Sequence, residues 1–146
     1  MPVISKDELK EMLAGVACGN VAGRRLGQIA PETMWQLAAS IPGTAMVESW
    51  WYRPRDLDYV AEGIAQSGSP EVVGIRCEID PKLARDRYES RGRHRIHSMG
   101  AAAAAAWADW AAHAAPLSLG PTIPVDTSGQ VHLAGLREQL ALAMGS

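Results

Sequence analysis

The first apolar stretch of the chain is short and β-branched, and a helical pattern follows it at once. Val3 and Ile4 form the β-branched pair, and Ser5 ends their run. Ser5 and Glu8 have the spacing of a capping box, in which each side chain satisfies a backbone amide of a first helical turn. One apolar face then continues at helical spacing through Leu9, Met12, Leu13 and Val16. The pattern predicts a strand that leads directly into a helix, with Asp7 in the first turn of that helix.

Short β-rich runs and helical patterns alternate to the end of the chain. Residues 19–30 are rich in glycine and poorly periodic, and Pro31 suits the first position of the next helix. After Val3 and Ile4, the expected strands are 44–48, 72–79 and 121–125, and the expected helices after the first are 31–41, 56–67, 81–91, 99–115 and 133–140. This alternation is typical of an α/β protein with a three-layer, doubly wound parallel sheet.

Composition and charge fit one folded domain that covers residues 1–146. The formal net charge of −2 and the pI of about 6.1 give no global field that would recruit nucleic acid. No apolar run reaches the roughly 18 residues that a membrane span needs, and the N-terminus lacks the layout of a signal peptide. We therefore expect a cytoplasmic protein whose partners include neither nucleic acid nor a membrane. Its oligomeric state stays open.

Three segments, taken in order, resemble the small-molecule and nucleotide kinases of the P-loop superfamily. The segments are PVISKDELKE, RCEIDPKLARDRYESRGRHRIH and PTIPVDTSG. The resemblance is to the zeta-toxin-like and chloramphenicol-phosphotransferase-like enzymes and to the short kinases named AAA-domain proteins. It implies a P-loop NTPase fold and an ATP-dependent phosphotransferase that acts on a small molecule or a nucleotide. ATP and Mg²⁺ are the cofactors that it implies.

One motif of that family does not occur in these 146 residues. In the family, a phosphate loop (Gly-x-x-x-x-Gly-Lys-Ser/Thr) cradles the β- and γ-phosphates and helps to hold Mg²⁺, and it lies before a segment like PVISKD. Here only Met1 precedes Pro2. The resemblance therefore implies a sheet without its first, central strand. We expect either that the protein starts upstream or that the chain is a remnant, inactive as it stands. The alternative is a non-catalytic, P-loop-like domain that binds a ligand or a partner.

The resemblance assigns roles to polar residues that follow three of the strands. Asp7 follows the first strand, where the family places the carboxylate that faces the acceptor hydroxyl, although an acidic residue also stabilises a helix N-terminus. Glu48 ends the second strand, near the metal of related kinases, and an exposed strand-end glutamate is the alternative. Asp126, Thr127 and Ser128 lie in the turn that borders adenine in the family, and an Asx turn would also explain them.

Five aromatic and basic residues directly after the second strand are the expected substrate-binding residues: Trp50, Trp51, Tyr52, Arg53 and Arg55. In open α/β sheets the carboxyl ends of the strands border the ligand crevice. Aromatic rings there can stack on a ligand ring, and guanidinium groups can bind an anion with two hydrogen bonds. The alternative is that the aromatic residues pack under a loop while the arginines stay solvated.

An arginine-rich segment at 91–98 resembles the lid of these kinases. The resemblance implies that Arg91 and Arg93 are catalytic, because they would neutralise charge on the transferring phosphoryl group, and that Arg87 contacts the nucleotide. Cations also stabilise the C-terminus of any helix, which is the alternative. His94 and His97 have no carboxylate or cysteine at metal-ligand spacing nearby in the sequence, so we expect no metal site there.

Overall fold

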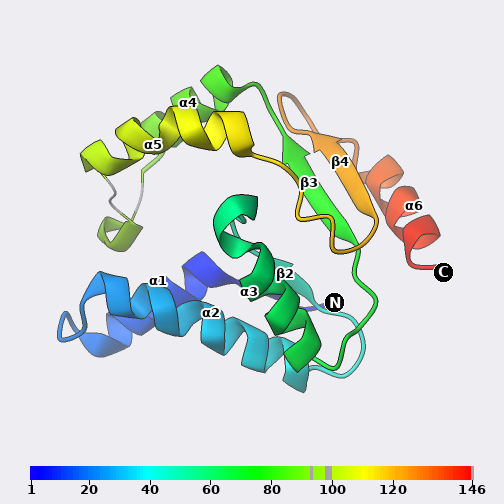
Figure 1. Ribbon diagram of the computed structural model, residues 1–146, viewed down its shortest axis with the longest axis horizontal. Helices are drawn as coiled ribbons and strands as arrows, with labels where there is room; N and C mark the ends of the chain where they lie inside the picture. The colour runs from blue at the N-terminus through cyan, green and yellow to red at the C-terminus, as the bar shows by residue number, and fades with distance from the viewer. Residues whose placement is uncertain (93, 98–99, 146) are drawn as a thin grey trace. The chain divides into compact units, whose positions relative to one another are not determined.

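The computed structural model describes residues 1–92, 94–97 and 100–145 and has the α/β alternation that the apolar pattern predicts (Figure 1). The strands are β1 (Val3–Ser5), β2 (Met46–Glu48), β3 (Gly74–Glu78) and β4 (Thr122–Asp126). The helices are α1 (Lys6–Ala17), α2 (Gly23–Ser40), α3 (Arg53–Gln66), α4 (Pro81–Ser90), α5 (Gly100–His113) and α6 (Leu133–Ala143), with a 3₁₀ turn, η1 (Arg95–His97). None of the helices in the described ranges is long and apolar enough to cross a membrane.

The strands form two separate parallel pairs. Ile4 of β1 lies opposite Val47 of β2, and Ile75 of β3 lies opposite Ile123 of β4. Parallel pairing is as expected, but the expectation of one four-stranded sheet is wrong for the described residues, where β2 and β3 are not hydrogen-bonded to each other. The physical reason is that each strand finds its hydrogen-bonded neighbour inside its own compact unit.

Two compact units divide the chain. Unit 1 comprises Met1–Trp51, Asp56–Pro70 and Arg93–Ala105, and unit 2 comprises Tyr52–Arg55, Glu71–Gly92 and Ala106–Ser146. The buried apolar side chains of unit 1 are Ile4, Leu26, Ala30, Met34, Trp35 and Val60. In the described part of unit 2, Ile123 alone reaches the same degree of burial. That the whole chain acts as one domain stays a prediction.

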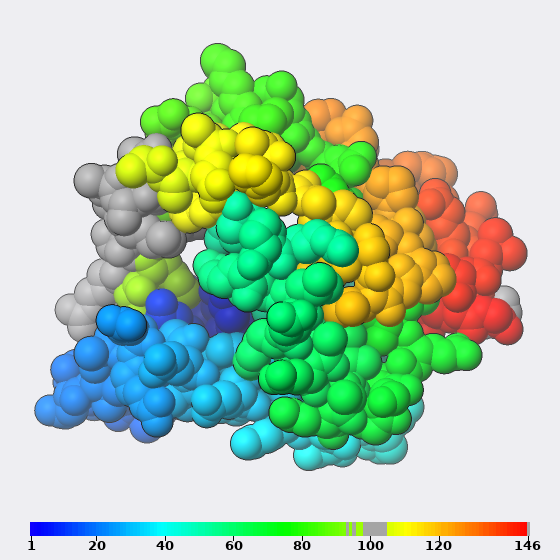
Figure 2. All heavy atoms as spheres, in the orientation of Figure 1, coloured from blue at the N-terminus to red at the C-terminus, as the bar shows by residue number. Residues whose placement is uncertain are grey.

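The junction between β1 and α1 forms as the sequence predicts. Ser5 is the N-cap of α1, and its hydroxyl accepts a hydrogen bond from the backbone amide of Glu8 at 3.4 Å. Such a cap satisfies one of the amides that a first helical turn leaves without a partner. α1 then packs along α2 (blue to cyan in Figures 1 and 2). Asp7 is thereby fixed to the first turn of a packed helix.

Helix α2 begins well before the proline that was expected to start it. Leu26, Ala30 and Met34 are buried at intervals of one turn, and Pro31 lies inside the helix. The expectation of an irregular segment at 19–30 is therefore wrong for residues 23–30, because burial of this apolar face outweighs the low helix propensity of glycine. Residues 19–22 lie outside the helices, as expected. The glycine at position 23 makes room for a side chain, because a Cβ there would lie 2.9 Å from the Cδ1 atom of Ile96.

Unit 2 contains the β3–β4 pair and a capped helix. Asp80 caps α4, and its Oδ1 atom accepts hydrogen bonds from the amides of Lys82 at 2.9 Å and Leu83 at 3.1 Å. Pro81 occupies the first turn, as predicted from the Asp-Pro pair. At the carboxyl end of the pair, the amide of Thr127 donates to the carbonyl of Glu78 at 2.8 Å. These contacts place the residues after β3 and β4 next to each other.

Candidate active site

The carboxyl ends of β1 and β2 lie side by side in unit 1 and carry two acidic side chains. Ser5 lies opposite Glu48, and its hydroxyl donates a 2.6 Å hydrogen bond to the Oε2 atom of Glu48. Asp7 follows Ser5 by two residues, and its side chain is 57% exposed. The parallel register therefore brings the two carboxylates predicted from the sequence, those of Asp7 and Glu48, to the carboxyl end of the strand pair.

Glu48 and Ser5 together offer oxygen donors for a magnesium ion. Enzymes that use nucleotides commonly bind Mg²⁺ through one or two carboxylates, while phosphates and waters supply the other ligands. Within the described ranges, no three His, Cys, Asp or Glu side chains gather in a group that could hold a metal by themselves. One carboxylate with one hydroxyl thus fits an ion that brings most of its ligands with a nucleotide.

Asp7 lies close to two nitrogen atoms of neighbouring side chains. Lys6 Nζ and His97 Nδ1 are each 3.9 Å from Asp7 Oδ1. His97 comes from η1, far along the chain, and its Nε2 atom is 3.1 Å from Glu11 Oε1. Asp7 and Glu11 are one helical turn apart on α1, so a single imidazole contacts both. No local sequence pattern indicates this approach of His97 to α1, because the two segments lie far apart in the chain.

Two further contacts fix η1 to the helices of unit 1. Lys10 Nζ donates a hydrogen bond to the carbonyl of Ile96 at 3.2 Å. Burial lowers the pKa of Lys10, an effect that the nearby Asp7 charge partly opposes. The Ile96 side chain lies over Gly23 of α2, where a Cβ atom would displace the end of that side chain. The chain directly before His97 is therefore held by two contacts of Ile96.

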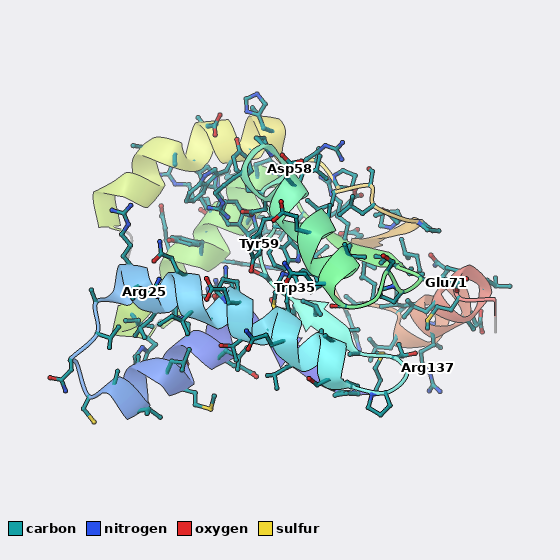
Figure 3. The ribbon with its side chains drawn as sticks, turned by 60° about the horizontal axis from the view of Figure 1, so that its bottom comes forward. Arg25, Trp35, Asp58, Tyr59, Glu71 and Arg137 are labelled. Carbon is teal, nitrogen blue, oxygen red and sulfur yellow. The ribbon has the colours of Figure 1, made fainter. Side chains whose placement is uncertain are left out.

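The two tryptophans after β2 have different surroundings. Trp51 stacks on the buried Trp35 of α2, with 6.3 Å between ring centroids and 23° between ring planes, whereas the side chain of Trp50 is exposed. Figure 3 shows Trp35 of α2 and Tyr59 of α3 close together. The structure thus supports the packing interpretation of Trp51, and the expected substrate contacts of Trp50 and Trp51 stay predictions.

Tyr52 and Arg53 contact the C-terminal part of α5 and the chain after it, within unit 2. The hydroxyl of Tyr52 donates to Asp109 Oδ2 at 2.5 Å, and this hydrogen bond is the main cause that raises the pKa of Tyr52. The guanidinium of Arg53 donates to the carbonyl of Pro116 at 2.7 Å. Arg55 is exposed. Tyr52 and Arg53 therefore have structural contacts of their own, and a substrate role for the three residues stays a prediction.

The turn after β4 is ordered by Arg87 and by its own side chains. The guanidinium of Arg87 donates to the carbonyls of Thr127 at 2.6 Å and Ser128 at 2.8 Å. Asp126 Oδ1 accepts from the amide of Ser128 at 2.8 Å, which is an Asx turn. Hydrogen bonds from the side chain and the backbone of Ser128 lower the pKa of Asp126. Arg87 and the expected nucleotide-binding turn are thus brought together, although Arg87 binds the turn itself.

The two arginines of the expected lid are Arg91 and Arg93. Arg91 follows α4, and its guanidinium carbon lies 6.0 Å from the centroid of the Tyr88 ring, within the range of a cation–π contact. Arg93 lies outside the described residues. The aromatic cluster beneath Arg91 continues from Tyr88 to Trp107 and Trp110 of α5.

The fold defined by these elements is that of a kinase-like α/β protein. The chain is similar over 98% of its length to the crystal structure of a candidate kinase from Chloroflexus aurantiacus J-10-fl, with a TM-score of 0.78. That match covers 84% of the other chain at 23% sequence identity. No protein-family model matches the sequence, and no curated protein matches it. The comparison therefore supports a shared fold.

Proposed function

We propose that the chain belongs to an ATP-dependent phosphotransferase that acts on a small molecule or a nucleotide, with a P-loop NTPase type of sheet. The observation that supports the proposal is the register of β1 and β2, in which Ser5 lies opposite Glu48 at the carboxyl ends of the two strands and Asp7 follows two residues later. The likeness of nearly the whole chain to a candidate kinase supports it. A cytoplasmic location is part of the same proposal.

Each group of residues has a role in this proposal. Asp7 orients the acceptor hydroxyl, and Glu48 with Ser5 holds the magnesium ion. Arg91 and Arg93 neutralise charge that develops on the transferring phosphoryl group, since fixed cations act most strongly where charge appears in the transition state. The nucleotide borders the turn 126–128, which Arg87 orders. ATP supplies the phosphoryl group, and the chain's own residues position the acceptor.

The 146-residue chain should bind Mg-ATP weakly, with a dissociation constant above about 1 mM. It contains no Gly-x-x-x-x-Gly-Lys-Ser/Thr motif, whose amides and lysine supply most of the contacts to the β- and γ-phosphates. Isothermal titration calorimetry measures this affinity directly. Binding in the low micromolar range would show that other residues replace the loop.

Substitution of Asp7 tests the acceptor side of the proposal. In a form of the protein extended at its N-terminus by a strand and a phosphate loop, Asp7→Asn should lower the rate of ADP release at least ~10²-fold. Its affinity for ATP should stay unchanged, because Asp7 faces the acceptor. Asp58→Asn, an exposed carboxylate of α3, is the matched control and should keep the full rate. A normal rate for Asp7→Asn would return Asp7 to the role of a helix-stabilising residue.

A non-catalytic binding domain is the second candidate. The guanidinium groups of Arg87 and Arg53 donate to backbone carbonyls, so both contribute to the fold of unit 2 without a ligand. If the extended form binds small hydroxylated molecules but releases no ADP with any of them, this second candidate is favoured.

A further inference from the structure

The orientation of His97 follows from its contact with Glu11. The His97 side chain is only 13% exposed, and its Nε2 atom lies 3.1 Å from Glu11 Oε1. An ionised carboxylate accepts hydrogen bonds and donates none. Nε2 must therefore carry the proton, and in the neutral imidazole the lone pair is then on Nδ1.

The Nδ1 atom of His97 lies near a second hydrogen-bond acceptor, the Asp7 carboxylate. Nδ1 of His97 lies 3.9 Å from Asp7 Oδ1, which is too long for a direct hydrogen bond. A neutral imidazole nitrogen and a carboxylate oxygen do not satisfy each other, whereas a hydroxyl group placed beside both can donate to either. The Nδ1 atom of His97 and the carboxylate of Asp7 are therefore suited to accept a hydrogen bond from a hydroxyl group between them.

The rest of the surroundings hold this arrangement in place. From α1, the charged groups near the imidazole are Asp7, Glu11 and Lys10, and Lys6 flanks Asp7. From α2, the packed residue is Gly23, which lies under Ile96. Lys10 also binds the carbonyl of Ile96, so the backbone directly before His97 is fixed. A base held by a carboxylate and aimed at a hydroxyl site is the arrangement used to activate weak nucleophiles.

We propose that His97, oriented by Glu11, is the proton acceptor that acts beside Asp7 on the hydroxyl of the phosphoryl acceptor; this inference rests on the proposed function. Asp7 then positions the hydroxyl, and His97 takes its proton at Nδ1. The O–H bond breaks as the hydroxyl oxygen bonds to the γ-phosphorus of a nucleoside triphosphate. The bond from that phosphorus to the bridging oxygen breaks, and the nucleoside diphosphate leaves with the electron pair.

A ¹⁵N NMR experiment on the full chain tests the orientation without any activity. In its neutral form, the imidazole of His97 should carry its proton on Nε2. His113 is the internal control, because its Nδ1 lies 3.0 Å from the backbone carbonyl of Asp109 and should carry the proton instead. Glu11→Gln should remove the preference of His97 for one form and leave His113 unchanged. A neutral His97 with its proton on Nδ1 would overturn the inference, because Nδ1 could then accept no proton from a hydroxyl group.

Kinetics of the extended form test the proton transfer. His97→Gln should lower kcat ~10²–10³-fold with little change in the KM of the acceptor. His113→Gln should keep the full rate. An unchanged kcat in His97→Gln overturns the inference even if Asp7→Asn is inactive. Absence of ADP release from every form would instead overturn the proposed function, and this inference with it.

Discussion

The hydroxyl of Tyr59 is buried without a hydrogen-bond partner among the described residues, as are the indole nitrogen of Trp35 and the hydroxyl of Ser49. An unsatisfied buried hydroxyl costs roughly 1–3 kcal/mol, while an apolar replacement of the same shape avoids that cost. Tyr59→Phe should therefore leave the free energy of unfolding unchanged or raise it by up to about 1 kcal/mol. Urea unfolding at pH 7 measures this. A clear loss of stability would show that the hydroxyl has a partner. Tyr52→Phe is the contrasting control, since it removes the hydrogen bond to Asp109 and should destabilise the protein.

The same residue should make stability depend on alkaline pH. Burial raises the pKa of Tyr59 above its ordinary value of 10.0, and the charge of Glu32 raises it further. The nearby Trp35 indole lowers it, although it makes no hydrogen bond of normal geometry to the Tyr59 hydroxyl. Above pH 10 the folded protein keeps this proton longer than the unfolded chain does. Its contribution to stability is thus complete below pH 10 and declines as the pH rises toward the folded pKa. Tyr59→Phe should show a shallower decline in unfolding free energy above pH 10, and equal slopes would contradict this.

At the scale of elements, the packing of α3 on α2 depends on a single glycine. A Cβ atom at Gly63 would lie 2.1 Å from Cε2 of the Trp35 ring, and Trp51 stacks on that ring as well. Gly63→Ala should lower the free energy of unfolding by roughly 1–3 kcal/mol or more, as overpacking of a core does. Gly15→Ala, in α1 with no atom within 4 Å of the new Cβ, is the matched control and should raise stability by up to about 1 kcal/mol. Equal effects of the two substitutions in urea unfolding would contradict the close packing of Trp35.

Local chemistry could be predicted from the sequence, and contacts between distant segments could not. The caps at Ser5 and Asp80 formed as predicted, because each depends on residues within one helical turn. The start of α2 was missed, because Gly23 resembles a helix breaker until its contact with Ile96 is known. The approach of His97 to Asp7 was also missed, because the two residues come from segments far apart in the sequence. Parallel pairing brings the carboxyl ends of β1 and β2 together, and the roles expected for Asp7 and Glu48 there stay predictions.

At the scale of the whole chain, burial is distributed unequally between the two units. Six of the buried apolar side chains belong to unit 1, namely Ile4, Leu26, Ala30, Met34, Trp35 and Val60. In the described part of unit 2, Ile123 alone is buried to that extent. Regions with few buried apolar contacts open at lower free energy. We therefore expect the amides of α2 around Ala30 to exchange with solvent most slowly, and those of unit 2 to exchange faster.

The exchange pattern within β3 gives the sharpest test of the two-pair arrangement. A strand with one parallel neighbour has its amides bonded only at alternate positions, and the amides of its other edge stay unpaired. Across Gly74–Glu78, slow and fast amides should therefore alternate, because β4 is the neighbour of β3 and β2 is not. Hydrogen–deuterium exchange read by NMR, on a sample shown to be monomeric, resolves each amide. The β3 residues should also be less protected than those of α2, because the pair that contains β3 encloses little apolar surface. Uniform slow exchange across β3 would mean that a second strand pairs with it in solution, and the two separate pairs would then be wrong.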